Sequence, residues 1–127
     1  MNVPLKRAYE PASEEDGYRV LVERLWPRGV TRERARLDEW AKEIAPSPDL
    51  RRWYGHDPAR FEEFRRRYLD ELAGHKEELE ELRRRAELGP LTLVFAARDE
   101  ARNSAVILAE VLRSQERVEP NSIPDDV

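Results

Sequence analysis

The sequence predicts one small α/β domain: a layered structure with a mainly parallel sheet of three to four strands, flanked by helices. Its length of 127 residues is that of a single domain. Segments with strand-like and helix-like apolar spacing alternate along the chain, which is typical of a parallel sheet. Residues 91–97 are almost all apolar and therefore predict a central strand covered on both faces. We expect residues 1–116 to form the domain and residues 117–127 to be a mobile acidic tail.

Two further strands are expected near the N-terminus. Residues 3–7 are short and half apolar, and residues 18–25 alternate as a strand with two different faces does. Arg24 falls on the same face as Val20 and Val22, so its side chain is expected to point partly inward. It then needs a partner, because burying an unpaired charge is costly.

The middle of the chain has helical spacing with one ambiguous segment. Thr31 is a suitable N-cap for a short helical turn. In residues 37–44 the apolar residues recur at helical spacing, but the segment is short and prolines close it, so a helix and an edge strand both remain open. A short helix is expected from residue 47 or 48 to residue 54.

A long helical pattern follows. Asp57 before a proline predicts a capped helix start, and Gly89 before a proline predicts its end. Gly74 lies inside the pattern and is expected to kink or split the helix. After the 91–97 strand, apolar residues between 105 and 112 predict a final amphipathic helix.

Composition excludes several classes of protein. The chain has no cysteine, which excludes thiolate catalysis and cysteine-ligated metals. Two histidines, His56 and His75, are too far apart to suggest metal ligands, and no metal or other cofactor is expected. No secretory signal and no run of about 20 apolar residues occurs, so a cytoplasmic protein without membrane contact is expected. The net charge of -4 does not favour a globally basic nucleic-acid-binding domain.

Several segments together resemble a known family. They read VERLWPRG at residues 22–29, WAKEIAPS at 40–47, LRRWYGHDP at 50–58 and TLVFAARD at 92–99. This pattern resembles the YeaO-like branch of the domain-of-unknown-function family DUF488, over residues 2–114. The resemblance implies a compact α/β domain and no established activity. Other branches carry cysteines and a histidine around the last strand and helix, whereas residues 95–103 contain neither, so thiol or metal chemistry does not carry over.

The segment after the second strand holds the first candidate site residues. In open α/β sheets, ligands bind beyond the carboxyl ends of the strands. Arg24 and Arg28 are therefore candidates to bind an anion through their guanidinium groups, with Trp26 as a stacking surface. Arg24 and Trp26 also have structural interpretations. Arg24 would form an ion pair with Glu23 or Asp99, and Trp26 would belong to the core.

The segment after the 91–97 strand holds the second group. A helix N-terminus attracts anions through its free N–H groups, so Asn103 is expected to bind a ligand there. Asp99 would act as a base or orient an arginine, and it is the favoured catalytic candidate, with a general-base role for His56 as the alternative. The alternative is that Asp99 caps the helix and Asn103 faces solvent. Lys42 and His56 are further candidates for ligand binding, although a surface lysine and a structural loop histidine are the simpler interpretations.

Two functions remain in view. The first is binding of a small anionic ligand (phosphate, carboxylate or nucleotide) at the strand carboxyl ends, with catalysis left undecided. The second is a non-enzymatic regulatory module that binds nucleic acid or protein through an arginine-rich helix face, residues 65–67 and 83–85. Glutamates four residues before most of these arginines favour a solvated, internally paired face, so nucleic acid is the less favoured partner. A purely structural role for both surfaces is the third possibility, and the sequence leaves the oligomeric state undecided.

Overall fold

The computed structural model describes the backbone of residues 2–122 and the side chains of residues 2–114. Its strands are β1 (Leu5–Arg7), β2 (Tyr18–Leu21), β3 (Glu39–Trp40) and β4 (Leu91–Phe95). Its α-helices are α1 (Arg32–Ala35), α2 (Pro48–Tyr54), α3 (Phe61–Leu72), α4 (Lys76–Leu88) and α5 (Ser104–Ser122). Three short 3-10 turns complete the order: η1 (Glu14–Asp16), η2 (Lys42–Ile44) and η3 (Pro58–Arg60).

The four strands form one parallel sheet in the order β1-β4-β2-β3. Leu93 of β4 lies opposite Leu5 on one side and Val20 on the other. All five residues of β4 are buried, because the strand has a neighbour on each edge and a covered surface on each face. The predicted α/β fold with a central strand at this position is therefore confirmed.

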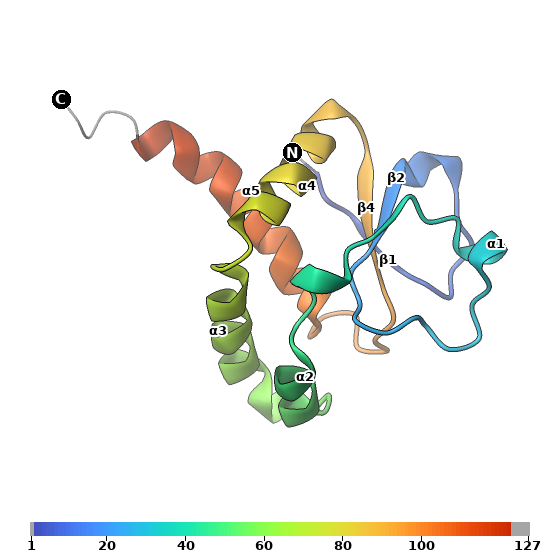
Figure 1. The fold of residues 1–127 in the computed structure, drawn as a ribbon, viewed down its shortest axis with the longest axis horizontal. Coiled ribbons are helices and arrows are strands. Elements are labelled where there is room, and N and C mark those ends of the chain that lie inside the picture. The colour runs from blue at the N-terminus through green and yellow to red at the C-terminus, as the bar shows by residue number, and fades with distance from the viewer. Residues whose placement is uncertain (1, 123–127) are drawn as a thin grey trace.

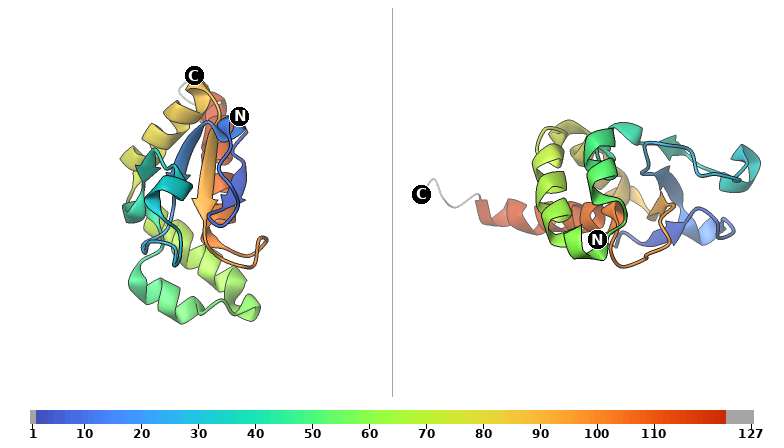
Figure 2. Two further views of the ribbon diagram at one scale, coloured as in Figure 1. Left: turned by 90° about the vertical axis from the view of Figure 1, so that its right-hand side faces the viewer. Right: turned by 90° about the horizontal axis from the view of Figure 1, so that it is seen from below.

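The two faces of the sheet are covered differently. Leu93 and Phe95 of β4 belong to the main hydrophobic core, which they share with the long helices. Val94 points to the opposite face because side chains alternate along a strand, and there it packs with Leu21 and Ala35 in a smaller cluster. In Figure 1, α5 and the short α1 lie on opposite sides of the sheet, and the further views in Figure 2 agree.

The main core is built by the apolar stripes of three helices. Buried residues of α3, α4 and α5 contribute Phe64, Tyr68, Leu72, Leu79, Leu82, Ile107, Leu108 and Leu112. The Tyr68 hydroxyl donates a hydrogen bond to the carbonyl oxygen of Ile44 at 2.6 Å, and burial raises its pKa. The core thereby holds the η2 turn, which leads into one wall of the pocket described below.

The two predicted caps, Thr31 and Asp57, are observed, and Ser47 is a third cap that was not predicted. The side chains of Thr31 and Ser47 accept hydrogen bonds from Arg34 N–H and Leu50 N–H, as N-caps of α1 and α2 do. Asp57 caps the η3 turn that leads into α3. The caps at Thr31 and Asp57 could be predicted because an N-cap is a local feature of the sequence.

The long helical pattern is split near Gly74. The first part ends at Leu72 and the second begins at Lys76. Turn hydrogen bonds from the N–H groups of Gly74 and His75 close the end of α3, and both helices then pack against α5. Of the two predicted outcomes, the split is the one observed.

Several boundaries differ from the expected ones. The strand expected over residues 18–25 ends at Leu21, and the last strand ends at Phe95. Residues 37–44 contain both of the open alternatives in part, since the short β3 is followed by the η2 turn. Helix α5 includes the backbone of residues 117–122, and residues 123–127, the rest of the expected tail, lie outside the described residues. Within the described part of the chain, no helix has the length and apolar character needed to cross a membrane.

Candidate functional site

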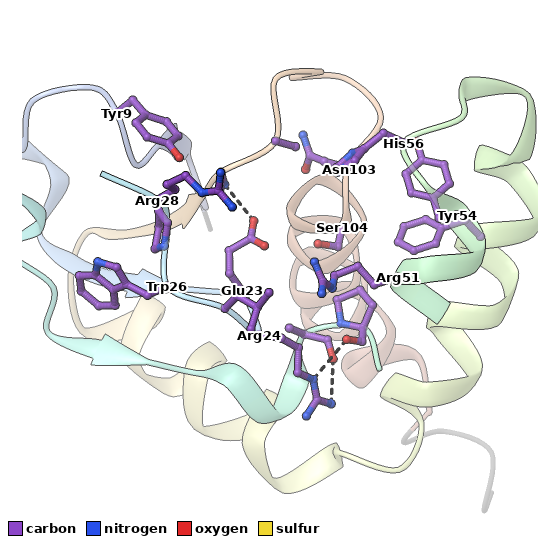
Figure 3. Close-up of a pocket in the computed structure, with 17 residues that line it drawn as sticks. Tyr9, Glu23, Arg24, Trp26, Arg28, Arg51, Tyr54, His56, Asn103 and Ser104 are labelled. Carbon is purple, nitrogen blue, oxygen red and sulfur yellow. Dashed lines mark hydrogen bonds between the residues drawn. The ribbon is translucent and has the colours of Figure 1, made fainter. Parts of the chain in front are cut away.

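A pocket of about 290 Å³ lies at the carboxyl ends of the two central strands, β2 and β4 (Figure 3). The lining residues are Tyr9 after β1, residues 23–28 after β2, residues 45–46 before α2, Arg51 and Tyr54 of α2, His56 beyond it, Phe64 of α3, residues 96–97 after β4, and residues 103–104 at the start of α5. The parallel sheet brings these segments together because both central strands end at the same edge.

The pocket gathers five of the seven residues that the sequence singles out. Arg24, Trp26, Arg28, His56 and Asn103 all line it. The predicted meeting of two strand ends at one site is therefore observed, although what these side chains bind stays a prediction.

Lys42 and Asp99 do not line this pocket. The Lys42 ammonium lies 4.1 Å from the ring centre of Trp40, and its side chain borders a separate hollow next to α4. The Asp99 carboxylate accepts hydrogen bonds from the N–H groups of Ala101 (2.9 Å) and Arg102 (3.0 Å). These bonds lower the pKa of Asp99, which makes it a weaker base than a free carboxylate.

Arg24 holds the backbone of the neighbouring segment. Its guanidinium donates to the carbonyl oxygens of Pro46 (3.2 Å), Ala45 (3.3 Å) and Glu43 (3.5 Å). It also lies 3.8 Å from the carboxylate of Glu43, so its observed partners are neither Glu23 nor Asp99. In Figure 3 this guanidinium points toward these carbonyls and away from the side chains grouped around Glu23.

Two other pocket arginines have guanidinium groups without a hydrogen bond or an ion pair in the described part of the chain. Among the described residues, the side chains of Arg28 and Arg51 make no hydrogen bond and no ion pair, and both are exposed. Arg28 is carried by the turn after β2, where Gly29 has a φ of 81° that favours glycine. Arg51 belongs to the last turn of α2. The two therefore reach the pocket from different elements.

Glu23 is the acidic residue of the pocket. Its Oε2 accepts a hydrogen bond from the N–H of Ala96 at 2.8 Å, and its backbone carbonyl accepts one from Nε1 of Trp40 at 2.6 Å. Burial raises the pKa of the Glu23 carboxyl, while the hydrogen bond from Ala96 N–H and the positive charge of Arg51 oppose this rise. In the view of Figure 3, Glu23 lies between Arg28 and Arg51.

The remaining predicted residues have structural contacts of their own. Trp26 donates its ring N–H to Val30 O at 2.6 Å, and its ring meets Trp40 edge-on, so it is anchored in the smaller cluster. His56 has a φ of 57° and its ring lies near that of Tyr54. Both residues therefore form walls of the pocket as parts of the folded framework.

Asn103 is the N-cap of α5. Its Oδ1 accepts from Val106 N–H at 3.0 Å, and its Nδ2 donates to Asp99 O at 2.8 Å. Only 4% of Asn103 is exposed, so the expectation that it faces solvent is wrong, and it rather than Asp99 caps the helix. Asp99 instead fixes the preceding turn.

The arginine-rich helix face is largely paired within the molecule. Arg66 and Arg67 both bond to Glu63, Arg65 pairs with Glu110, and Arg84 pairs with Glu81. Two members of the second run depart from the solvated face expected for it. Arg83 is only 7% exposed and bonds to Glu80, and the Arg85 guanidinium lies 4.3 Å from the ring centre of Tyr18.

Sequence reasoning missed Glu23 as a pocket residue and Arg51 altogether. The position of Glu23 next to Arg24, near the end of a predicted strand, was a signal that could have pointed to the pocket. Which of these side chains faces the pocket depends on the residue at which the strand ends. Arg51 lies in a helix that the sequence predicts, yet its approach to the strand ends is a tertiary contact without a local signal. In the described part of the chain, no group of three or more histidine and acidic side chains is arranged to hold a metal ion.

Comparison with known proteins identifies the family of the chain. The uncharacterised protein YeaO of Escherichia coli (strain K12) is 46% identical over 114 residues, which cover 90% of this chain and 99% of YeaO. The uncharacterised protein Rv3073c of Mycobacterium tuberculosis (strain ATCC 25618 / H37Rv) is 42% identical over 113 residues, covering 89% of this chain and 95% of that protein. No solved structure matches the chain significantly. Residues 2–125 match the family described as the inactive DUF488-N3 subclade. The resemblance read from the sequence is thus confirmed, and the chain belongs to this YeaO-like subclade of the DUF488 family.

Proposed function

We propose that the pocket at the strand carboxyl ends binds a small anionic ligand, a phosphate, carboxylate or nucleotide, through Arg28 and Arg51. One observation carries this proposal. These two guanidinium groups line the same pocket and have no hydrogen bond or ion pair among the described residues. The arginines of α3, in contrast, have carboxylate partners nearby.

The chemistry of the two side chains suits an anion. A guanidinium offers several N–H donors in a plane and matches the oxygens of phosphate and carboxylate in pairs. Two guanidinium groups from separate elements can hold an anion from two directions. The start of α5 forms part of the same wall, and its N-terminal end adds a positive potential.

Binding is better supported than catalysis. Asp99, the catalytic candidate from the sequence, lies outside the pocket lining and its pKa is lowered by backbone hydrogen bonds. A lowered pKa makes proton abstraction near neutral pH less effective. The description of the family as inactive also favours a binding role.

The rival module that binds nucleic acid has less support. Internal ion pairs already occupy most of the α3 and α4 arginines, and the chain carries a net charge of -4. Binding to phosphate backbones depends on free cationic side chains and falls steeply with salt. Among the described residues, Arg28 and Arg51 of the pocket are unpaired, whereas most arginines of α3 and α4 are paired, so this distribution favours a small ligand in the pocket over nucleic acid on the helices.

A thermal-shift titration tests the proposal. The protein in low-salt, phosphate-free buffer is titrated with inorganic phosphate, citrate and a short single-stranded oligonucleotide. A ligand that binds only the folded state increases the free energy of unfolding and so raises the melting temperature. At a ligand concentration of 100 times its Kd, the increase is about 2.7 kcal/mol. We expect phosphate or citrate to stabilise the wild-type protein and to have little effect on the double variant Arg28→Gln/Arg51→Gln.

The matched control is Arg34→Gln. Arg34 is an exposed arginine of α1, outside the pocket, and its replacement removes the same charge. We expect this variant to keep at least half of the wild-type stabilisation by phosphate. Equal stabilisation of the double variant and the control, or stabilisation by the oligonucleotide alone, would contradict the pocket proposal.

A further inference from the structure

The pocket that is proposed to bind an anion also contains a carboxylate. Glu23 lines the pocket beside the strand ends, together with Arg28 and Arg51. Its backbone is fixed by the bond from Trp40 Nε1, and its Oε2 by the bond from Ala96 N–H. Glu23 therefore occupies a defined position, which is what a recognition group requires.

The second carboxylate oxygen of Glu23 is available. Oε1 accepts no hydrogen bond from any described residue. It is also not one of the fully buried side-chain oxygen and nitrogen atoms that lack a partner, so it is accessible from the pocket side. The side chain nevertheless stands in a partly buried setting that raises its pKa. Oε1 is therefore an acceptor that faces the pocket and is open to a donor from a bound ligand.

The chemistry of that ligand follows from the acceptor. An ionised carboxylate binds N–H and O–H donors, and it binds an ammonium group most strongly because the charges are opposite. A purely anionic ligand would be repelled by Glu23 while it is attracted by the arginines. A ligand that carries an amino group and an anionic group satisfies both ends of the pocket.

We infer that the ligand is a small zwitterion whose amino group binds Oε1 of Glu23 while Arg28 and Arg51 hold its anionic group. This inference rests on the proposed function, because it assigns the anionic end to the same two arginines. The pocket of about 290 Å³ is at the small end of the range for ligand sites, which fits a compact molecule of this kind.

Calorimetric titration with matched probes tests the inference. The probes are 2-aminoethyl phosphate against ethyl phosphate, and β-alanine against propionate, each pair differing by one amino group. We expect the wild-type protein to bind at least one amino-bearing probe about tenfold more tightly than its partner. We expect Glu23→Gln to lose this preference and to bind ethyl phosphate or propionate as well as the wild type or better.

The control variant is Glu62→Gln, at an exposed glutamate of α3 outside the pocket, and it is expected to keep the amino preference. Equal affinity within both pairs for the wild type, or a preference that survives in Glu23→Gln, would overturn the inference and leave anion binding intact. Failure of ethyl phosphate, propionate, inorganic phosphate and both amino-bearing probes to bind the wild type would instead overturn the proposed function. Should Glu23→Gln fail to fold, the two wild-type comparisons alone decide: equal affinity within both pairs overturns the inference.

Discussion

The carboxylate of Glu23 accepts the N–H of Ala96 at 2.8 Å and so joins the residues that follow the two central strands. Glu23 lies two residues beyond the end of β2, and Ala96 is the first residue after β4. The bond closes the edge of the sheet where the pocket begins. It also leaves a partly buried carboxylate beside Arg28 and Arg51, which gives the pocket both signs of charge.

Glu23→Gln is expected to stabilise the protein at pH 7 by about 0.5–2 kcal/mol, as replacing a costly functional group often does. The amide oxygen of the new side chain can still accept the bond from Ala96 N–H, and the desolvated charge is gone. The pKa of Glu23 in the folded state is raised above its ordinary value of 4.5. The ionised carboxylate therefore destabilises the fold only above pH 4.5, and the full cost is reached once the pH exceeds the folded-state pKa. Urea unfolding of both proteins at pH 7 and below pH 4 measures the gain, which should vanish at the lower pH. A variant less stable than wild type at pH 7 would contradict this assignment.

Asp16→Asn is expected to destabilise the protein at pH 7 by about 3–5 kcal/mol, the usual cost of breaking a buried ion pair. The Asp16 carboxylate meets Nη1 of Arg19 at 2.6 Å, and only 3% of the Arg19 side chain is exposed. Burial acts to raise the pKa of Asp16, but hydrogen bonds from Ser13, Lys6 and Arg19 outweigh it and hold the pKa below 3.8.

The pH dependence of that variant has a definite sign. A lowered pKa means that Asp16 contributes stability above its ordinary pKa and loses it as the pH falls through the folded-state value. The difference between Asp16→Asn and wild type should therefore shrink below pH 3.8 in denaturant titrations. A constant difference from pH 7 to pH 2.5 would show that the ion pair is not the source.

Arg24→Met is expected to lower stability by about 1–3 kcal/mol without loss of anion binding. Removing the guanidinium leaves the carbonyl oxygens of Ala45 and Pro46 without their donor. Thermal unfolding with and without phosphate measures both effects, with Arg34→Met as the control for charge. Loss of phosphate binding in a variant of unchanged stability would instead make Arg24 a ligand group, as the sequence alone suggests.

Asn103→Ala is expected to cost about 1–2 kcal/mol, because α5 loses its N-cap. Asn103→Asp keeps the acceptor for Val106 N–H and loses the donor to Asp99 O, so its stability should lie nearer to wild type. Comparing the two variants by urea unfolding separates the cap from the second bond. Equal stability of the alanine variant and wild type would contradict a capping role.

Much of the fold depends on local features of the sequence. The side chains of Ser47 and Thr31 each accept a hydrogen bond from the N–H three residues later, and the apolar run of β4 indicates that this strand is central in the sheet. The sequence also predicts that Arg28 and Asn103 meet at one edge, since parallel strands end together. The sequence could not show that Arg24 bonds to the carbonyl oxygens before α2 or that Arg51 lines the pocket. The positions of both side chains depend on how α2 packs.

Amide chemical-shift mapping tests anion binding by this pocket most directly. The ¹⁵N-labelled protein is titrated with inorganic phosphate, with the arginine side-chain Nε–H signals recorded alongside the backbone. We expect saturable shifts at the Nε–H groups of Arg28 and Arg51 and at the backbone N–H groups of residues 28–29 and 104–105. Saturable shifts confined to α3 and α4, or no saturable shift at any phosphate concentration up to 50 mM, about fifty times a Kd of 1 mM, would contradict it.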